Sequence, residues 1–276
     1  MSARSVPDMF DLSGRVAVIT GGAGLLGRKH AEAVTECGGT AVLLDLTAEA
    51  AESAARDIGE NSLGLATDIT DHQALQDTLT AILEKFGRVD ILVNNAANNP
   101  KMEDNGLSDR PWSRLENFPL EMWNDDINIG LTGAFLCAQI FGSEMAHAGS
   151  GVILNIASDL GLIAPDQRIY RKAGKTEDEQ PVKPVTYSVV KTGLIGLTKY
   201  LSTYWADAGV RANALVPGGV YNDQDDAFVE KLTNLIPMGR MADKDEYKAA
   251  VAFLISDASS YMTGANLVID GGRTVW

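Results

Sequence analysis

The chain alternates short apolar runs with segments of helical periodicity from residue 15 almost to its C-terminus. The apolar runs are rich in β-branched residues and apolar on both faces, which is typical of parallel strands covered by helices on either side. The predicted strands are RVAVIT (15–20), TAVLLDL (40–46), SLGLATD (62–68), VDILVNN (89–95), GVILNIA (151–157), VRANALV (210–216) and NLVID (266–270). Helices are predicted over the segment that includes Cys37 and over residues 48–59, 71–86, 121–147, 187–205, 225–235 and 244–255.

The order of these elements predicts a single α/β domain. About seven strands alternate with helices, no Pro/Gly/Ser-rich linker separates them, and no repeat of fixed period is present. Repeated βα units of this kind fold as a Rossmann-like, doubly wound parallel sheet, which we expect to span residues 1–276. Two long polar inserts, 98–118 and 159–184, follow predicted strands at their carboxyl ends, where open α/β sheets bind ligands.

The composition narrows the class of partner. A hydrophobic fraction of 45% supports a large core, and a formal charge of −14 disfavours nucleic acids and anionic membrane surfaces, which are polyanions. No apolar run approaches the roughly 20 residues that span a bilayer, and the N-terminus lacks a long apolar core. The two cysteines, Cys37 and Cys137, fall in apolar helical patterns and are interpreted as buried reduced thiols. We therefore expect a cytoplasmic protein that acts on a small molecule.

A glycine-rich turn follows the first strand. RVAVIT runs into GGAGLLG, in which Gly21, Gly24 and Gly27 are spaced as G-x-x-G-x-x-G ahead of a helix. Such a turn lets backbone N–H groups and the helix N-terminus approach a pyrophosphate closely. An ordinary structural turn is the alternative, because glycine-rich turns after strands are common.

The end of the second strand indicates which dinucleotide is bound. Asp45 lies roughly 20 residues beyond the glycine turn, where a carboxylate can accept hydrogen bonds from a ribose 2′-hydroxyl and repel a 2′-phosphate. Asp45 therefore favours NAD over NADP, although Arg28 and Lys29 are close by in the sequence. The alternative for Asp45 is a helix-capping aspartate.

PVTYSVVKTG, residues 184–193, places a phenol and an ammonium one helical turn apart. Tyr187 and Lys191 should reach the same edge of the sheet as Ser158, which follows the strand GVILNIA. A tyrosine with a pKa of about 10 is a poor base at neutral pH, but a neighbouring ammonium and the positive nicotinamide ring both favour phenolate. Tyr187 could then exchange a proton with an alcohol or carbonyl oxygen that Ser158 holds, while the cofactor carries hydride. A solvated helix face is the alternative.

These motifs, in this order and spacing, resemble the short-chain dehydrogenase/reductase family over nearly the whole chain. The resemblance is carried by TGGAGLLG, Asp45, the ATD that contains Asp68, NNAA, NIAS, YSVVK, NALVPGG and the terminal VIDGG. It implies catalysis by Ser158, Tyr187 and Lys191, with Lys191 also at the nicotinamide ribose. It further implies cofactor contacts from Gly21, Gly24, Leu26, Gly27, Asp45, Asp68, Ile69, Asn94, Asn95, Ala96, Tyr187, Lys191, Pro217, Gly218 and Val220.

The sequence departs from the family pattern in three places. Leu25 occupies the middle glycine position of the short-form motif, and Ala97 stands where a glycine is usual after NNA. The asparagine that commonly completes a proton relay is replaced by Gly130, with Asn128 two residues upstream. Two residues on a helix turn a side chain by about 200°, so Asn128 should face elsewhere unless the helix is kinked or bulged. Otherwise water or a residue from an insert must complete the relay.

The inserts bear on the substrate, because loops this long in compact domains are generally functional or disordered. Arginines gathered over an active site suit phosphate or carboxylate recognition, and a solvated charged loop is the alternative. We expect a sugar or sugar derivative with an anionic group. The segment NIASDLGLIAPDQRIY also resembles the oxidoreductases of bacterial flagellin-modification and nonulosonic-acid sugar pathways. The basic residues are Lys101, Arg110, Arg114, Arg168, Arg171, Lys172 and Lys175.

The histidines and the C-terminal segment bear on metal binding and on oligomeric state. His30, His72 and His147 have no metal-ligand spacing, so we expect structural histidines and no metal. In the resembling family the C-terminal segment YMTGANLVIDGG packs against a partner subunit, which implies a dimer or tetramer. The sequence thus predicts an NAD-dependent oxidoreductase acting on a secondary alcohol or ketone. A reductase of an apolar ketone or acyl substrate, and a non-catalytic nucleotide sensor, are the alternatives.

Overall fold

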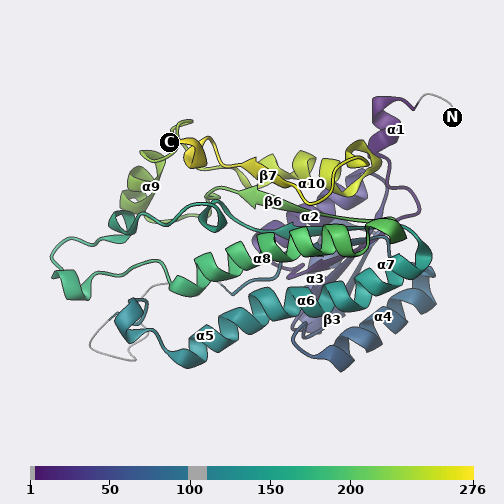
Figure 1. Ribbon diagram of the computed structural model, residues 1–276, viewed down its shortest axis with the longest axis horizontal. Helices are drawn as coiled ribbons and strands as arrows, with labels where there is room; N and C mark the ends of the chain where they lie inside the picture. The colour runs from purple at the N-terminus through teal and green to yellow at the C-terminus, as the bar shows by residue number, and fades with distance from the viewer. Residues whose placement is uncertain (1–3, 99–110) are drawn as a thin grey trace.

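The computed structural model describes residues 4–98 and 111–276 and has one seven-stranded parallel sheet (Figure 1). The strand order is β3-β2-β1-β4-β5-β6-β7, which confirms the predicted doubly wound fold and all seven predicted strands. The chain crosses over between β3 and β4, so the carboxyl ends of β1 and β4 lie side by side at the switch point. The strands are β1 Val16–Thr20, β2 Thr40–Asp45, β3 Ser62–Ala66, β4 Ile91–Asn94, β5 Gly151–Ile156, β6 Val210–Pro217 and β7 Asn266–Ile269.

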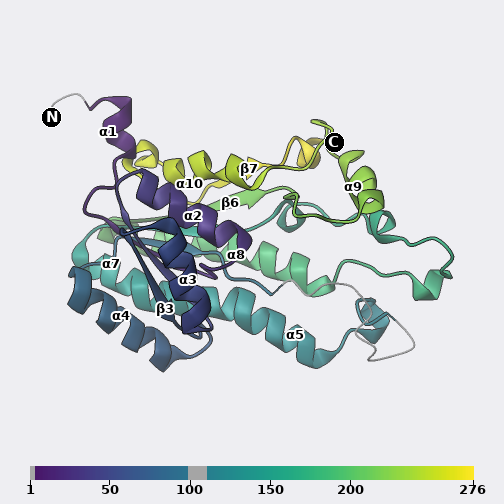
Figure 2. The same cartoon turned by 180° about the vertical axis from the view of Figure 1, so that it is seen from behind.

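Helices cover both faces of the sheet (Figures 1 and 2). One layer consists of α4 His72–Phe86, α5 Leu120–Ile127, α6 Gly133–Cys137, α7 Ser143–Ala148 and α8 Val185–Tyr204. The other consists of α2 Leu25–Glu36, α3 Ala48–Ile58 and α10 Lys248–Ile255. Two further helices, α1 Val6–Phe10 and α9 Asp226–Thr233, lie outside these layers. The sequence did not predict α1, and the predicted helix 244–255 begins with a 3₁₀ turn over Lys244–Tyr247.

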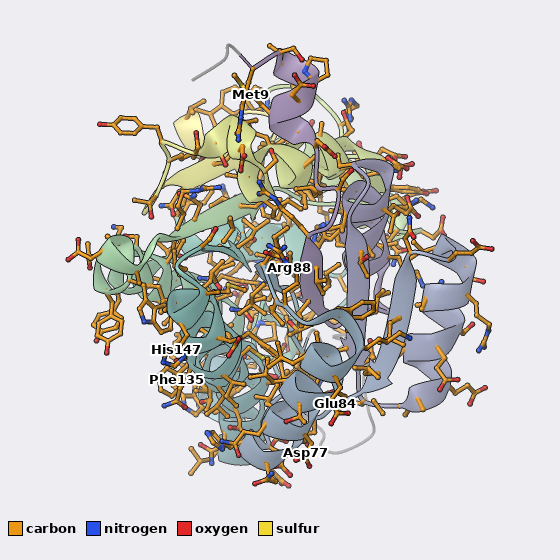
Figure 3. All side chains as sticks on the ribbon, turned by 90° about the vertical axis from the view of Figure 1, so that its right-hand side faces the viewer. Met9, Asp77, Glu84, Arg88, Phe135 and His147 are labelled. Carbon is orange, nitrogen blue, oxygen red and sulfur yellow. The ribbon has the colours of Figure 1, made fainter. Side chains whose placement is uncertain are left out.

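Helix α4 illustrates how local sequence sets these elements. The Asp71 side chain caps its N-terminus by accepting from the backbone N–H groups of Gln73 and Ala74, and Gly87 ends it in the left-handed conformation. Leu75 and Ile82 face the sheet and are fully buried. Asp77 and Glu84 are exposed on the outer side of the helix (Figure 3). This alternation fixes one face of α4 against the core.

The long helical segment Leu120–Ala148 is interrupted twice. Five-residue π-helical turns over Asn128–Thr132 and Ala138–Gly142 separate α5, α6 and α7. The segment spans 29 residues and is long and apolar enough to cross a membrane by length and composition, which corrects the expectation that no run approaches this length. Half of its most apolar window is buried within the protein, and it packs as one layer against the sheet, as is typical of a core helix.

The two inserts contact each other beyond the carboxyl ends of the strands. The second insert forms 3₁₀ turns over Asp159–Gly161, Gln167–Tyr170 and Glu177–Glu179, and its buried Ile169 packs against α9. Arg114 of the first insert donates to the Glu177 carbonyl oxygen at 2.8 Å, and the Val182 N–H donates to Ser113 Oγ at 3.2 Å. These contacts place both inserts over the same end of the sheet as the glycine turn.

Candidate active site

The glycine turn is built by close backbone contacts. Gly21 has φ +61°, and a Cβ there would lie 3.0 Å from the Ala96 Cα. A Cβ on Gly27 would lie 2.1 Å from the Gly21 carbonyl oxygen, so only glycine lets α2 approach the turn this closely. Gly22, which the sequence analysis did not single out, is equally restricted, because a Cβ there would lie 2.6 Å from Leu43 Cβ. The close packing of the turn therefore requires glycine at these three positions.

The residues around this turn fit a dinucleotide. Helix α2 begins after Gly24 with no side-chain cap, which leaves first-turn N–H groups available to a pyrophosphate. The Asp45 carboxylate accepts from the Ala23 N–H at 3.0 Å and from the Leu46 N–H at 3.0 Å, and so stands directly beside the turn. It is not a helix cap, since Thr47 caps α3.

The segment after β4 is hydrogen-bonded to the start of the glycine turn. The backbone N–H groups of Asn95 and Ala96 both donate to Thr20 Oγ1 at 3.0 Å. The Asn95 amide also donates to the carbonyl oxygens of Thr20 and Gly21, at 3.0 and 3.1 Å. Asn94 is buried and donates to Asn155 Oδ1 at 2.9 Å, which braces β4 against β5. Thr20 was missed from sequence, although its place before the first glycine is a usable signal.

The other predicted cofactor residues lie along the same edge. Asp68 is exposed and caps a local turn by accepting from the Thr70 N–H at 2.9 Å. Ile69 is buried and packs against Gly133, where a Cβ would lie 2.7 Å from Ile69 Cδ1. Leu26 lies in the first turn of α2 and packs against the core. Pro217 ends β6, Gly218 donates to the Ile269 carbonyl oxygen at 3.0 Å, and Val220 pairs with Ala242.

The structure brings Ser158, Tyr187 and Lys191 together at this edge. Ser158 follows β5 and is 5% exposed, and Tyr187 and Lys191 lie one turn apart on α8. The Lys191 Nζ lies 5.8 Å from the Tyr187 ring centroid and donates to the Ile156 carbonyl oxygen at 2.8 Å. A hydrogen bond with Ser158 acts on the Tyr187 phenol. The predicted alternative of a solvated helix face does not describe this pair.

Burial dominates the electrostatics of the trio. It lowers the pKa of Lys191 to about 8, and the nearby ammonium of Lys183 contributes to the same shift. Burial also raises the pKa of Tyr187, while the hydrogen bond with Ser158 lowers it. The sequence predicted that the Lys191 ammonium would lower the pKa of Tyr187. For the polypeptide alone the net direction is upward, because desolvation of the phenolate outweighs the favourable contacts.

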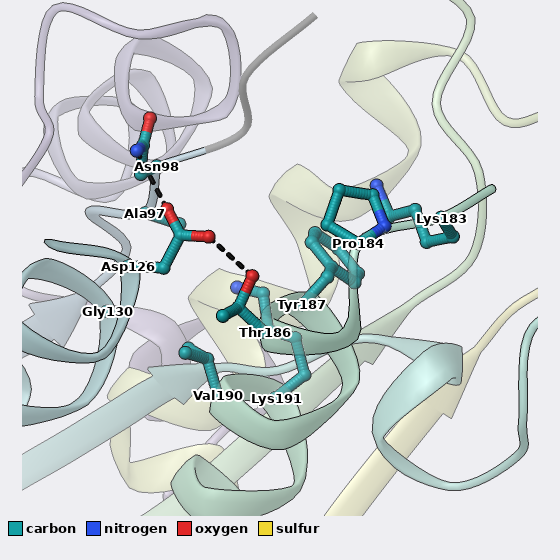
Figure 4. Close-up of a pocket in the computed structure, with 10 residues that line it drawn as sticks. All are labelled: Ala97, Asn98, Asp126, Gly130, Lys183, Pro184, Thr186, Tyr187, Val190 and Lys191. Carbon is teal, nitrogen blue, oxygen red and sulfur yellow. Dashed lines mark hydrogen bonds between the residues drawn. The ribbon is translucent and has the colours of Figure 1, made fainter. Parts of the chain in front are cut away.

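A small pocket opens beside Tyr187 (Figure 4). The Asp126 carboxylate is buried at its wall, where it accepts from Asn98 Nδ2 at 2.8 Å and from the Thr186 hydroxyl. The Lys183 Nζ lies over the Tyr187 ring, 3.8 Å from its centroid, and burial lowers its pKa to about 8. The described residues that line the pocket are Ala97, Asn98, Asp126, Gly130, Lys183, Pro184, Thr186, Tyr187, Val190 and Lys191.

Sequence reasoning missed Asp126, Thr186 and Lys183. Lys183 stands four residues before Tyr187, the same spacing that drew attention to Lys191, but Pro184 caps the helix and places Lys183 outside it. Its position over the ring depends on the path of the insert, which no local pattern encodes.

Gly130 occupies the position of the family's relay asparagine, as predicted, and Asn128 lies two residues upstream. The π-helical turn begins at Asn128, so the helix is bulged at this point, yet the Asn128 side chain is exposed. Gly130 lines the pocket instead, and a Cβ there would lie 2.6 Å from Val190 Cγ1. Asn128 is therefore not among the described residues that line the pocket. Asn98 and Lys183, one from each insert, line the same pocket, and relay by water or by an insert residue remains a prediction.

The predicted arginine cluster does not form over the pocket. Arg168 pairs with Asp166 at 2.6 Å and Arg171 with Glu177 at 2.8 Å, and both guanidinium groups are exposed. For these two arginines the structure favours the alternative of a solvated charged loop, because acidic neighbours within the insert hold them at the surface. Lys101 and Arg110 lie outside the described residues.

None of the three histidines and two cysteines lines the pocket beside Tyr187. His30 is fully buried, which lowers its pKa to about 4 and keeps the ring neutral. His72 begins α4 and His147 lies in α7, as predicted. Burial raises the pKa of both the Cys37 and Cys137 thiols, which keeps them protonated. Among residues 4–98 and 111–276, no three His, Cys, Asp or Glu side chains gather in a way that could hold a metal ion.

Comparisons with known proteins agree with this geometry. A family model described as enoyl-(acyl carrier protein) reductase matches residues 22–274. D-threitol dehydrogenase of Mycolicibacterium smegmatis is 36% identical over 98% of this chain and 97% of its own. NAD-dependent glycerol dehydrogenase of Listeria innocua serovar 6a is 32% identical over 96% of each chain. The crystal structure of a gluconate 5-dehydrogenase from Burkholderia cenocepacia J2315, in complex with NADP and tartrate, has a TM-score of 0.84 and 29% identity, and covers 99% of this chain and 100% of that chain. The chain therefore belongs to the short-chain dehydrogenase/reductase family and is an oxidoreductase that acts on CH–OH groups.

Proposed function

We propose that the protein is an NAD-dependent dehydrogenase that interconverts a secondary alcohol and a ketone on a polyol or sugar derivative. The observation that carries this proposal is the convergence of Ser158, Tyr187 and Lys191 beside the glycine turn. A protein that only sensed a nucleotide would have no use for a phenol and an ammonium that line the same pocket.

The residues of the chain divide the work of the reaction. In alcohol oxidation, the Tyr187 phenolate accepts the proton of the substrate hydroxyl, and in reduction the phenol returns it to the ketone oxygen. The Ser158 hydroxyl binds the same substrate oxygen. Lys191 holds positive charge beside the phenol and can donate to the ribose hydroxyls. Bound nicotinamide supplies the hydride acceptor or donor.

Three features of the described residues support NAD as the cofactor. Asp45 presents a carboxylate at the end of β2, where a 2′-phosphate would meet its negative charge. Arg28 is paired with Asp57 at 2.7 Å and also donates to the Ala23 carbonyl oxygen. Lys29 is paired with Glu32 and Asp245, both at 2.9 Å. The two cations that could have received a 2′-phosphate are therefore engaged elsewhere.

The pocket lining supports a polyhydroxylated substrate. Asn98, Asp126 and Lys183 provide hydrogen-bonding groups around Tyr187 that suit hydroxyls adjacent to the reacting carbon. The names of the threitol, glycerol and gluconate dehydrogenases point to the same class of substrate. The narrower resemblance to nonulosonic-acid sugar enzymes remains a prediction.

The test is a substrate and cofactor panel followed by nicotinamide absorbance. We expect turnover with NAD on tetritols, pentitols, hexitols or aldonic acids, and much less on cyclohexanol or an acyl thioester. Tyr187→Phe should lower kcat by about 10²–10⁴-fold while the affinity for NAD changes little, since the phenol supplies the proton transfer. Turnover that survives this substitution would contradict the role of Tyr187, and equal efficiency with NADP would contradict the cofactor assignment.

We further propose a homo-oligomer in the cytoplasm, a dimer or a tetramer. Large apolar side chains are exposed near the C-terminal strand, including Tyr261 and Val268. Aromatic residues on α8, Tyr200 and Tyr204, are also exposed and stack at 5.5 Å between ring centroids. Light scattering on the purified protein should give a mass of two or four chains of 29.4 kDa, and a monomeric mass would refute the proposal.

A further inference from the structure

We propose that Asp159 and Arg273 are positioning residues for the catalytic hydroxyl of Ser158, an inference that rests on the proposed function. Neither residue belongs to the trio described above, and no spacing in the sequence relates them. Asp159 follows Ser158 directly, whereas Arg273 lies 114 residues farther along the chain, in a 3₁₀ turn at the C-terminus. The fold brings the last turn of the polypeptide against the catalytic serine.

A continuous chain of hydrogen bonds links the three residues. Ser158 Oγ donates to Asp159 Oδ1 at 2.7 Å, and the Leu160 N–H donates to the same carboxylate oxygen at 2.8 Å. Arg273 Nη1 donates to the other oxygen, Oδ2, at 2.7 Å. The Leu160 N–H also lies 3.2 Å from Ser158 Oγ. The carboxylate thereby fixes the rotation of the serine side chain while the guanidinium fixes the carboxylate. Because Ser158 carries a single hydroxyl proton, that proton leaves Asp159 when Ser158 donates to the phenolate or to the substrate oxygen.

The ion pair between Arg273 and Asp159 is buried, where such a pair adds little to the stability of the fold. The side chains of Arg273 and Asp159 are 6% and 4% exposed, so both charges are removed from water. Desolvation of two buried charges largely cancels their attraction, and apolar side chains of similar size are often as stable. A buried pair that touches a catalytic hydroxyl is better explained by the orientation that it imposes. We therefore assign it to the reaction rather than to the stability of the core.

Arg273 also neutralises the charge that Asp159 brings next to the phenol. Three further charged or titratable groups face Tyr187: the ammonium groups of Lys183 and Lys191, and the phenol of Tyr170. Within this set the Asp159 carboxylate raises the pKa of Tyr187, and the Arg273 guanidinium lowers it. Arg273 therefore offsets part of the effect that the carboxylate holding Ser158 has on the pKa of Tyr187.

The test separates the two charges by mutation. In alcohol oxidation the phenolate is the active form, so kcat/KM rises with pH through the pKa of Tyr187. Arg273→Met should move this rise of kcat/KM, the acidic limb of the profile, to higher pH by about one pH unit. At a fixed pH below the limb, kcat/KM should then be roughly tenfold lower. Asp159→Asn should move it to lower pH and reduce the plateau about tenfold, because Ser158 loses a charged acceptor. The double variant should return the limb close to the wild-type position.

Two further variants distinguish positioning from folding. Arg273→Lys keeps the charge and should keep the limb in place while lowering only the plateau. Arg240→Met is the matched control, because Arg240 forms an exposed pair with Glu246 at 2.6 Å, and it should leave the whole profile unchanged. The proposal would be overturned if the acidic limb of the kcat/KM profile stayed at its wild-type pH in Arg273→Met and Asp159→Asn. It would also be overturned if the limb moved in the same direction in both variants. If Arg273→Met does not fold, Asp159→Asn and Arg273→Lys decide the question by the same criteria.

A direct titration keeps this test independent of the proposed function. The ultraviolet difference absorbance of the phenolate, corrected by the same titration of Tyr187→Phe, reports the pKa of Tyr187 without turnover. Absence of turnover on every alcohol would contradict the proposed function, whereas the opposite shifts in Arg273→Met and Asp159→Asn would still support the pair. Turnover with unshifted titrations would retain the function and refute the pair.

Discussion

The cofactor side and the substrate side of this active site are built in different ways. The cofactor side is made of backbone: the glycine turn, the N-terminus of α2 and the ends of β1, β2 and β4. The substrate side is made largely of side chains, which come from α5, α8 and two inserts that hold each other through contacts such as Arg114 to Glu177 and Val182 to Ser113. Both sides meet at α8, where Tyr187 and Lys191 stand one turn apart.

This difference affects how each side tolerates change. A backbone-built site fails when an added atom has nowhere to go, as at Gly27, because strands and helices cannot shift independently. A site that includes inserts can adjust, because surface ion pairs contribute little and loops tolerate change better than the elements that they connect. Substitutions on the cofactor side should therefore have larger effects than substitutions on the insert side, and the largest should fall where the two sides meet.

Lys191→Met tests that junction. We expect kcat/KM to fall by at least about 10²-fold, since the ammonium beside the phenol is lost. The same change should raise stability at pH 7. Burial lowers the pKa of Lys191 to about 8 from the ordinary 10.5, so the unfolded chain binds more protons between these values and wild-type stability rises with pH across that window. Below about pH 8 the buried charge opposes folding in full.

The Lys191→Met stability gain is measured by denaturant unfolding at pH 7 and pH 10. Allowing for the Ile156 carbonyl oxygen left without its donor, we expect a net gain of about 1 kcal/mol at pH 7 that shrinks toward pH 10. A loss of stability of the same size at both pH values would show that the buried charge does not oppose folding.

Gly27→Ala tests the backbone-built side. The new Cβ would meet the Gly21 carbonyl oxygen at 2.1 Å with no flexible atom to move aside, so the turn must open. We expect the free energy of unfolding to fall by about 1–3 kcal/mol and NAD affinity to fall at least about tenfold, as measured by denaturant unfolding and fluorescence titration. Gly196→Ala on α8 is the control, because nothing lies within 4 Å of its added Cβ. Equal effects at both positions would contradict the comparison.

The same contrast explains what the sequence could predict. The strands, the glycine turn, Asp45 and the Tyr187–Lys191 pair were predicted because each depends on local spacing or on the order of βα units. Lys183 and Arg273 were not predicted, because an insert and the C-terminal turn bring them to the site across many residues. Arg168 was wrongly placed over the pocket because sequence gives no sign that Asp166 holds it at the surface.

Asp45→Asn tests cofactor choice on the backbone-built side. The amide keeps the shape of the side chain and loses the charge that repels a 2′-phosphate. We expect NAD affinity to fall about tenfold, and the ratio of NAD affinity to NADP affinity to fall by more than that, because NADP is no longer repelled. Titration of both cofactors by fluorescence measures this. Glu52→Gln, an exposed carboxylate of α3 that pairs with Arg56, should change neither affinity. An unchanged ratio of the two affinities in Asp45→Asn would mean that another group sets the preference.

Arg114→Met tests the insert-built side and should have the smallest effect. It removes the 2.8 Å hydrogen bond to the Glu177 carbonyl oxygen that joins the two inserts, so the pocket wall that they share should loosen. We expect KM for the alcohol to rise roughly 2–5-fold, in line with the loss of one charged hydrogen bond, with little change in melting temperature or in NAD affinity. Initial rates at saturating NAD and a cofactor titration measure the two effects separately.

Arg171→Met is the control for Arg114→Met, since Arg171 pairs with Glu177 through its side chain at 2.8 Å but remains exposed and joins no second insert. It should leave KM unchanged, because exposed ion pairs contribute little. If Arg114→Met weakened NAD binding as much as it raised KM, the two sides would not be independent, and the inserts would have to be treated as part of the cofactor site. A KM effect confined to Arg114→Met instead locates substrate recognition in the contact between the inserts.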